Sequence, residues 1–323
     1  MSYKTLTAVC AVALAGTCTH VVAQSYPDRP VRLVVGFTPG GAADYVGRSI
    51  GESLARALGQ PIVIDNKPGA GSSIAAEHVA KSAPDGYTVL IASPSSISVN
   101  PSLDPKRAPA VQSLVPVTKV SSSPLVIATN PTSGITSISD LIAKAKKSPG
   151  TLNYASAGSG SAPHLGGVLF NQLTGAGLTH IPYKGGAPAV LSVIAGDTQV
   201  TFATPPSVLP FIKSGRLRGL AVSTTERSPL VPDLPGMKEA GLPAYKMGFW
   251  YGFFVPAGTP PEIVKKLYEA TAVAVQRPEV KAALAREGTD VALSASPAEF
   301  AAFLKEDNDF WAKLAKESGA KIE

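Results

Sequence analysis

Short apolar strands alternate with helical segments along most of the sequence, and this alternation limits the chain to a few architectures. The strand-like run at 31–35 is followed by a helical segment in which apolar residues recur every four positions, as far as Gly59. A strand at 61–64, a helix at 72–81 and a strand at 87–92 repeat the pattern. Strand–helix–strand units of this length predict an α/β fold with a parallel sheet and right-handed crossovers.

The pattern restarts after a segment at 117–130, which we interpret as a boundary between domains. Further strands and helices are predicted beyond it, and the last helix begins near Pro297. The part of the chain that follows residue 23 has about 300 residues, a length that usually forms two domains. We expect one domain to comprise residues 24–121 and 250–323, and the other to comprise residues 122–249.

The first 23 residues are expected to be a secretory signal peptide and not part of the fold. Lys4 provides a positive start, the apolar run at 6–16 is too short to anchor in a bilayer, and small residues follow at 21–23. A buried first helix fits these features less well. We therefore expect a periplasmic protein.

Both cysteines of the chain, Cys10 and Cys18, lie in this leader. The mature chain then needs neither a disulfide nor a thiolate metal site. Cys18 raises the alternative of a lipid anchor, but Thr17 fits a lipidation motif poorly, and we favour free release.

The composition describes a packed globular protein, with 45% hydrophobic and 16% charged residues and a net charge of +6. The positive charges are scattered and form none of the dense stripes that nucleic-acid backbones require. We expect no nucleic-acid partner, although a mild positive excess suits anionic ligands.

Two glycine-rich turns, at 38–43 and 156–162, occupy equivalent places in the two halves of the chain. Each follows a strand and precedes a helix start. The first N–H groups of a helix lack internal partners, and the peptide dipoles add about half a positive charge there. Such turns bind anions without a formal cation. The pair favours a carboxylate held between facing domains.

Several residues near these turns have structural alternatives. Asp44 lies in the first turn of its helix, where stabilising the dipole is a better interpretation than ligand contact. His164 either contacts the ligand or bonds to a loop carbonyl. His78 and His180 show no spacing typical of metal ligands, so no metal site is expected. Phe37 is either core or the wall of a pocket.

Motifs of enzymes are weak. No serine stands in a G-x-S-x-G elbow, and no P-loop occurs. The run at 69–74 matches a dinucleotide fingerprint in two glycines only, since Ile74 replaces the third small residue. A catalytic triad remains open but unsupported. We expect neither enzymatic activity nor a cofactor.

Motifs distributed over the whole mature chain resemble the substrate-binding proteins of tripartite tricarboxylate transporters, the Bug receptors. In the first half they are YPDRPV at 26–31, GFTPGGAAD at 36–44, DNKPGAG at 65–71 and DGYT at 85–88. Further on they are YASAGSGSAPHL at 154–165, HIPYKGG at 180–186 and PAGTP at 256–260.

The resemblance implies a type II periplasmic-binding-protein fold, in which two α/β domains close by a hinge on an interdomain ligand cleft. It implies carboxylate capture by backbone groups and ordered waters, with few salt bridges. The implied ligand-binding residues are Phe37, Thr38, Gly40, Gly41 and Ala42 in one jaw, Ser156, Ser159, Ser161, Ala162 and His164 in the other, Ser93 and Thr204 at strand ends, and Lys184 as an electrostatic contributor. Thr38 stands where the family usually has a smaller residue.

We therefore expect a periplasmic solute-binding receptor, monomeric, that captures a small aliphatic or aromatic mono- or dicarboxylate and delivers it to the membrane subunits of a transporter. A periplasmic sensor that feeds a signalling partner and a secreted α/β hydrolase remain as alternatives.

Overall fold

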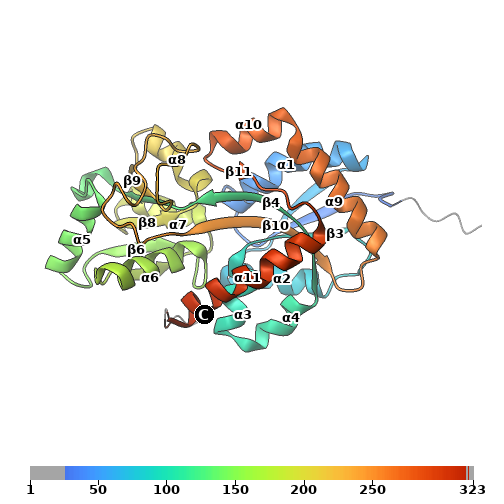
Figure 1. Cartoon of the computed structure of the whole chain (residues 1–323), viewed down its shortest axis with the longest axis horizontal. Helices are drawn as coiled ribbons and strands as arrows, with labels where there is room; N and C mark the ends of the chain where they lie inside the picture. The colour runs from blue at the N-terminus through green and yellow to red at the C-terminus, as the bar shows by residue number, and fades with distance from the viewer. Residues whose placement is uncertain (1–25, 318, 320–323) are drawn as a thin grey trace, which may run out of the picture.

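A computed structural model describes residues 26–317 and 319. The predicted signal peptide and both cysteines lie outside the described residues. The molecule is elongated and has two lobes joined by extended strands (Figure 1).

The first lobe is built on a sheet that has six strands in the described part of the chain. Its parallel centre pairs β1 with β2 on one side and with β3 on the other. Strand β10 runs antiparallel to β3, and β4 runs antiparallel to β10. The strand order is β11 (Asp290–Val291), β4 (Leu114–Pro124), β10 (Gly248–Pro256), β3 (Thr88–Ala92), β1 (Val31–Val35) and β2 (Ile62–Asn66).

The second lobe repeats this plan with five strands among the residues described. Strands β6, β7 and β8 are parallel, and β5 and β9 complete the sheet in antiparallel pairings. The order is β7 (Thr179–Pro182), β6 (Asn153–Ser156), β8 (Val200–Ala203), β5 (Val126–Thr129) and β9 (Arg218–Val222). The prediction of a parallel sheet is therefore wrong in part, because each sheet also takes in antiparallel strands from the segments that pass between the lobes.

Helices cover the faces of both sheets (Figure 1). Helix α1 illustrates why they form: Val46, Ile50 and Leu54 are buried along one face, and Gly59 ends the helix at φ 72°. The first lobe carries α1 (Ala42–Leu58), α2 (Ser73–Ala80), α3 (Asn100–Leu103), α4 (Ala108–Gln112), α9 (Pro261–Gln276), α10 (Pro278–Arg286) and α11 (Pro297–Glu317). The second carries α5 (Ile138–Lys147), α6 (Ala162–Thr174), α7 (Gly186–Ala195) and α8 (Pro205–Lys213).

Short helical turns lie between these elements. They are η1 (Ala70–Ser72), the π-helical η2 (Ser95–Val99), η3 (Pro105–Arg107) and η4 (Pro131–Ser133).

The segment at 117–130, predicted as a domain boundary, is occupied by strands β4 and β5, which belong to different sheets. The chain crosses between the sheets from Pro124 to Val126 and returns between β9 and β10. Ser223 ties the crossings together, because its Oγ accepts a hydrogen bond from the Leu125 N–H (2.8 Å) and donates one to the Met247 carbonyl.

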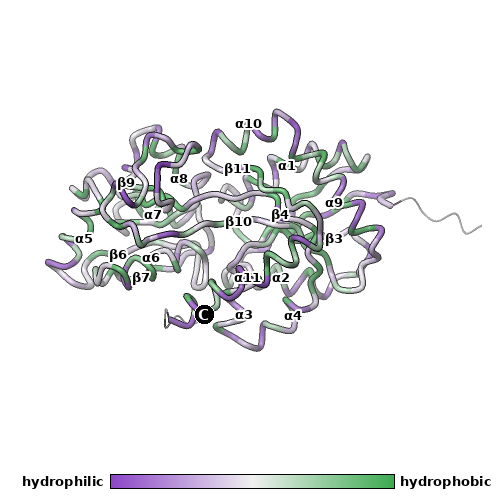
Figure 2. The backbone as a smooth tube through the Cα atoms, viewed as in Figure 1, coloured by the Kyte–Doolittle hydropathy of each residue, from purple (hydrophilic) through white to green (hydrophobic). Residues whose placement is uncertain are grey.

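Hydrophobic residues are frequent on the strands at the centre of each lobe, and hydrophilic stretches lie at the outer ends, for example on α5 (Figure 2). One hydrophobic cluster contains residues of both lobes, from Val31 on β1 to Phe202 on β8, and includes Phe37, Phe249 and Tyr251. No helix in the described range is long and apolar enough to cross a membrane.

Candidate ligand-binding cleft

A cavity between the lobes, which we call the inner pocket, is lined by residues of both. It encloses about 450 Å³, including the part that opens to solvent. None of the described residues that line it is charged. The lining consists of Phe37, Gly41, Ala42, Ala43, Ser95, Ala157, Ser161, Ala162, Pro163, Gly186, Ala189, Thr201, Ala203, Thr204, Ser207, Phe249 and Tyr251.

Four helix starts converge on the inner pocket. The N-cap residues are Gly41 for α1, Ser161 for α6, Gly185 for α7 and Thr204 for α8. Each supplies or adjoins lining residues, so four positive dipole ends face a small uncharged space. Helix α8 contributes only its dipole at the first turn, because prolines at 205 and 206 have no N–H to donate.

Asp44 holds the first jaw in shape. Its Oδ2 accepts hydrogen bonds from the Gly40 N–H (3.0 Å) and Arg48 Nε (2.9 Å), and its Oδ1 accepts one from Asn66 Nδ2 (3.1 Å). The same amide nitrogen donates to the Phe37 carbonyl at 3.0 Å. Burial opposes ionisation, but the hydrogen bonds from Arg48, Gly40 and Asn66 outweigh it and hold the pKa of Asp44 below its usual value. The carboxylate is a structural tie.

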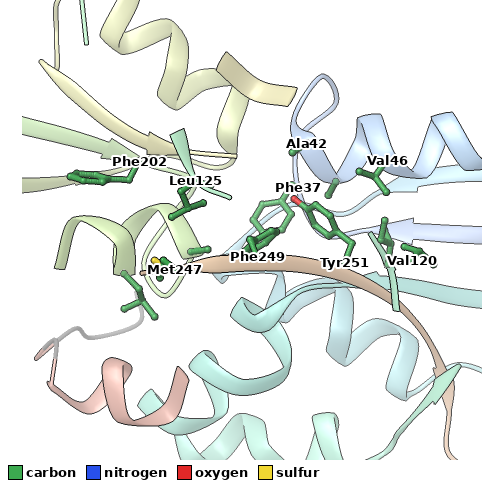
Figure 3. Packing of buried hydrophobic residues seen from close by; sticks show 14 of the residues in the cluster. Phe37, Ala42, Val46, Val120, Leu125, Phe202, Met247, Phe249 and Tyr251 are labelled. Atoms are coloured by element: carbon green, nitrogen blue, oxygen red, sulfur yellow. The ribbon is translucent and has the colours of Figure 1, made fainter. Parts of the chain in front are cut away.

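Three aromatic side chains form one wall of the inner pocket. Phe37, Phe249 and Tyr251 lie side by side where β10 passes between the lobes (Figure 3). Phe249 and Tyr251 contact edge to face, with centroids 4.9 Å apart. Burial raises the pKa of the Tyr251 hydroxyl, which bonds to the Thr204 side chain, so the phenol is neutral at physiological pH.

Hydroxyl groups give the inner pocket its polar character. Ser95 and Ser207 are 1% and 4% exposed, and neither Oγ has a hydrogen-bond partner among the described residues. The hydroxyls of Thr38, Ser72 and Ser93 are likewise buried and unpartnered at the edges of the cleft. A buried hydroxyl without a partner costs about 1–3 kcal/mol, and a ligand that bonds to the Ser95 and Ser207 hydroxyls would recover this cost.

The second jaw is shaped by its own side chains. Ser161 caps α6 by accepting the His164 N–H (3.4 Å). Ser156 Oγ accepts the Gly158 N–H at 3.1 Å and lies 2.6 Å from His180 Nε2. His164 Nδ1 accepts a hydrogen bond from the Gly160 N–H at 3.1 Å. The partner of this nitrogen is therefore a loop N–H group and not the loop carbonyl that one of the two interpretations expected. The side chains of Ser156 and His164 therefore support the loop.

An outer pocket lies beside the inner one and shares Phe37 and Ala157 with it. It encloses about 770 Å³, including the part that opens to solvent, and Lys184 is the charged residue among the described residues that line it. Its other lining residues are Gly69, Ala70, Gly71, Ser72, Gly158, Ser159, Pro182 and Tyr183.

The predicted site residues occupy three kinds of position. Phe37, Gly41, Ala42, Ser161, Ala162 and Thr204 line the inner pocket, while Ser159 and Lys184 line the outer pocket. Thr38, Gly40, Ser93, Ser156 and His164 lie in or beside the same loops but outside both linings. Residues of both predicted jaws thus lie at the cleft, together with Lys184.

The sequence placed Thr204, the N-cap of α8, at the cleft, but it did not identify the start of α7 or part of the lining. Ser95 stands in a serine-rich run after β3, and that run was the available clue. Phe249 and Tyr251 alternate along β10, so they share one face of the strand. Within the described ranges, no group of three His, Cys, Asp or Glu side chains is placed to hold a metal ion.

Comparison with known proteins agrees with this geometry. Residues 46–320 match the family described as tripartite tricarboxylate transporter family receptor. The chain is 38% identical to BugT of Bordetella pertussis (strain Tohama I) over 96% of each chain.

Two solved structures have nearly the same fold. A protein of R. palustris solved with adipate is 33% identical, with a TM-score of 0.87 over 92% of this chain and 99% of that one. MatC of Rhodopseudomonas palustris, solved with bound malate, is 31% identical, with a TM-score of 0.85 over 90% and 100%. The two lobes are therefore the two domains of a periplasmic-binding-protein fold, as predicted. The chain belongs to the tripartite tricarboxylate transporter receptor family, the Bug receptors, which bind solutes and are not enzymes.

Proposed function

We propose that this receptor captures a small carboxylate in the inner pocket, with the anion held by backbone N–H groups and hydroxyls. The observation that carries the proposal is the convergence of the α1, α6 and α7 helix starts on a pocket whose lining is uncharged. The unpartnered hydroxyls of Ser95 and Ser207 supply further donors. Preorganised dipoles and hydroxyls bind an anion with no buried cation to desolvate.

The ligand class that we propose is a mono- or dicarboxylate with an aliphatic or aromatic body. The aromatic wall of Phe37, Phe249 and Tyr251 offers apolar surface for the body of the acid. The relatives solved with adipate and malate hold dicarboxylates.

We further propose that the receptor acts as a monomer in the periplasm, after removal of residues 1–23, and delivers its ligand to the membrane subunits of a tripartite tricarboxylate-type transporter. The domains would be 24–121 with 250–323, and 122–249. The crossings near Pro124, Ser223 and Gly248 would then form the hinge, which agrees with the change of sheet at these points.

A thermal-shift panel of aliphatic and aromatic acids, with the corresponding amides as uncharged controls, tests ligand capture. An acid present at about a hundred times its dissociation constant is expected to stabilise the folded state by about 2.7 kcal/mol, and its amide is expected to have no effect. If no acid shifts the unfolding temperature, the proposal is wrong. Mass spectrometry of small molecules released from the purified receptor then identifies the acid that it retains.

Delivery is tested by uptake of the identified acid into cells with and without the receptor. Uptake that is independent of the receptor, although the acid binds, would favour a sensing role instead.

A further inference from the structure

Two stacked histidines lie directly behind the second jaw. The rings of His164 on α6 and His180 on β7 are 3.9 Å apart between centroids and inclined at 22°. Tyr154 on β6 packs on the same stack, with its ring 5.0 Å from that of His180, and its hydroxyl donates to the His164 carbonyl at 3.2 Å. His164 is only 5% exposed.

His164 contacts the loop between β6 and α6 through a nitrogen of its ring, and His180 contacts Ser156, the last residue of β6, in the same way. His164 Nδ1 accepts the Gly160 N–H at 3.1 Å, so the neutral ring carries its proton on Nε2. His180 Nε2 lies 2.6 Å from Ser156 Oγ, which in turn accepts the Gly158 N–H. The two histidines thus fix two glycines of one short loop.

That loop lines both pockets. Ala157 faces the inner and the outer pocket, Ser159 faces the outer pocket, and Ser161 faces the inner pocket and caps α6. Gly158 and Gly160 have φ values of 119° and 75°, at which few L-residues are stable. The loop therefore depends on its hydrogen bonds to keep a shape that its backbone does not otherwise favour.

We propose that His164 is a positioning residue for ligand capture: its neutral ring accepts the Gly160 N–H and so holds the loop at 157–161 in the shape that completes the site. His180 supports His164 by stacking and fixes the other end of the loop through Ser156. Neither side chain lines a pocket, so both act through the loop.

The role requires an unprotonated Nδ1, and the surroundings favour one. Burial lowers the pKa of His164 to about 4. The pKa of His180 is lowered to about 3, mainly by burial and to a smaller extent by repulsion from His164. Among the described residues, the titratable groups in ring contact with the pair are the two rings themselves and Tyr154, whose pKa burial raises, so it stays neutral. Helix α6 carries no Asp, Glu, Lys or Arg.

Two variants separate the acceptor from mere packing. In His164→Asn the side-chain oxygen stands near the place of Nδ1 and accepts the Gly160 N–H without titrating. In His164→Leu the acceptor is lost, while both variants lose the ring stack. We expect His164→Asn to bind adipate or malate within about threefold of the native receptor, and His164→Leu to bind at least about tenfold more weakly, by calorimetry at pH 7.

Nuclear magnetic resonance gives a readout that a packing role would not move. In the ligand-free protein, the Gly160 amide shift is expected to follow the titration of His164, about half complete at pH 4, and to lose this step in His164→Asn, where His180 is the remaining histidine of the pair. Equal affinity of the two variants, or a Gly160 shift that ignores His164, would overturn the proposal. The affinity arm rests on the proposed function. If the native receptor binds neither acid, that function is in doubt, while the Gly160 titration still decides the role of His164.

Discussion

Thr38 of the first jaw lies against Gly185 of the other lobe, so closely that Gly185 has no room for a side chain. A Cβ at Gly185 would stand 2.3 Å from Thr38 Oγ1 and 3.2 Å from the Thr38 nitrogen. Likewise, an added Cβ would stand 2.8 Å from the Ser159 carbonyl oxygen at Gly71, and 2.2 Å from Asn100 Oδ1 at Gly160. The structure is therefore in a closed arrangement, in which glycines let the two lobes meet.

Gly185→Ala is expected to hinder this closure and to weaken ligand binding at least about tenfold, because a methyl group would displace Thr38 from the α7 start. Gly185 also has φ 151°, which strains any L-residue. Gly175→Ala is the matched control, since φ is 64° there but no atom lies within 4 Å of the added carbon. Calorimetry should show weakened ligand binding only for Gly185→Ala. If both variants lose the same affinity, the contact between Gly185 and Thr38 is not what closure depends on.

Ser95→Ala is expected to weaken ligand binding about tenfold without lowering the stability of the free receptor. Its hydroxyl is buried and unpartnered, so removing it costs the free protein no hydrogen bond and relieves a desolvated group. Ser121 on β4 is equally buried and unpartnered but lines neither pocket, so Ser121→Ala is the control. Urea unfolding should give the same change in stability for both variants, whereas titration with the identified acid should show weaker binding only for Ser95→Ala. Native affinity in Ser95→Ala would exclude Ser95 from the ligand contacts.

The elements that local patterns determine were predicted well. Helix α1 shows apolar residues at every fourth position and a glycine at its end, and the structure places it at Ala42–Leu58. The jaws were equally visible, because a glycine-rich turn before a helix start has a local signature. Residues of both turns line the cavity between the lobes, although neither motif says how the domains meet.

The parts that depend on distant partners were not visible. Strand β10 pairs with β4, where Trp250 lies opposite Ser122, far away in the sequence. No local pattern says that these strands run antiparallel or that they link two sheets. The same holds for the lining: Ser95 faces the inner pocket because a π-helical turn places it there, and periodicity does not anticipate such a turn.

Asp44→Asn is expected to destabilise the receptor by about 1–2 kcal/mol at pH 7, because a charged acceptor that ties Gly40, Arg48 and Asn66 becomes neutral. The pKa of Asp44 is lower in the folded protein than in the unfolded chain, where it is about 3.8. The ionised carboxylate therefore stabilises the folded state fully at pH values above 3.8, and this contribution is lost as the pH falls through the folded pKa. Urea unfolding at pH 7 and pH 3 should therefore show a difference from the native protein that shrinks in acid. Asp140→Asn changes a first-turn acid of α5, a helix that supplies no residue to either pocket, and should leave ligand affinity unchanged. A difference that persists in acid would mean that the charge of Asp44 is not what holds the jaw.

Phe37→Ala is expected to join the two pockets and to change which acids bind. Phe37 is 9% exposed and lines both pockets, so removing its ring costs about 3 kcal/mol of stability and leaves an apolar space beside Phe249 and Tyr251. Apolar spaces of that size accept a benzene ring, so the affinity for benzoate should rise relative to that for adipate. Phe310→Ala removes an aromatic ring that is 45% exposed on α11, and it should change neither stability nor the ratio by a measurable amount. Competition titrations of both acids against both variants give the ratio. An unchanged ratio in Phe37→Ala would show that the ring at position 37 does not limit the size of the bound acid.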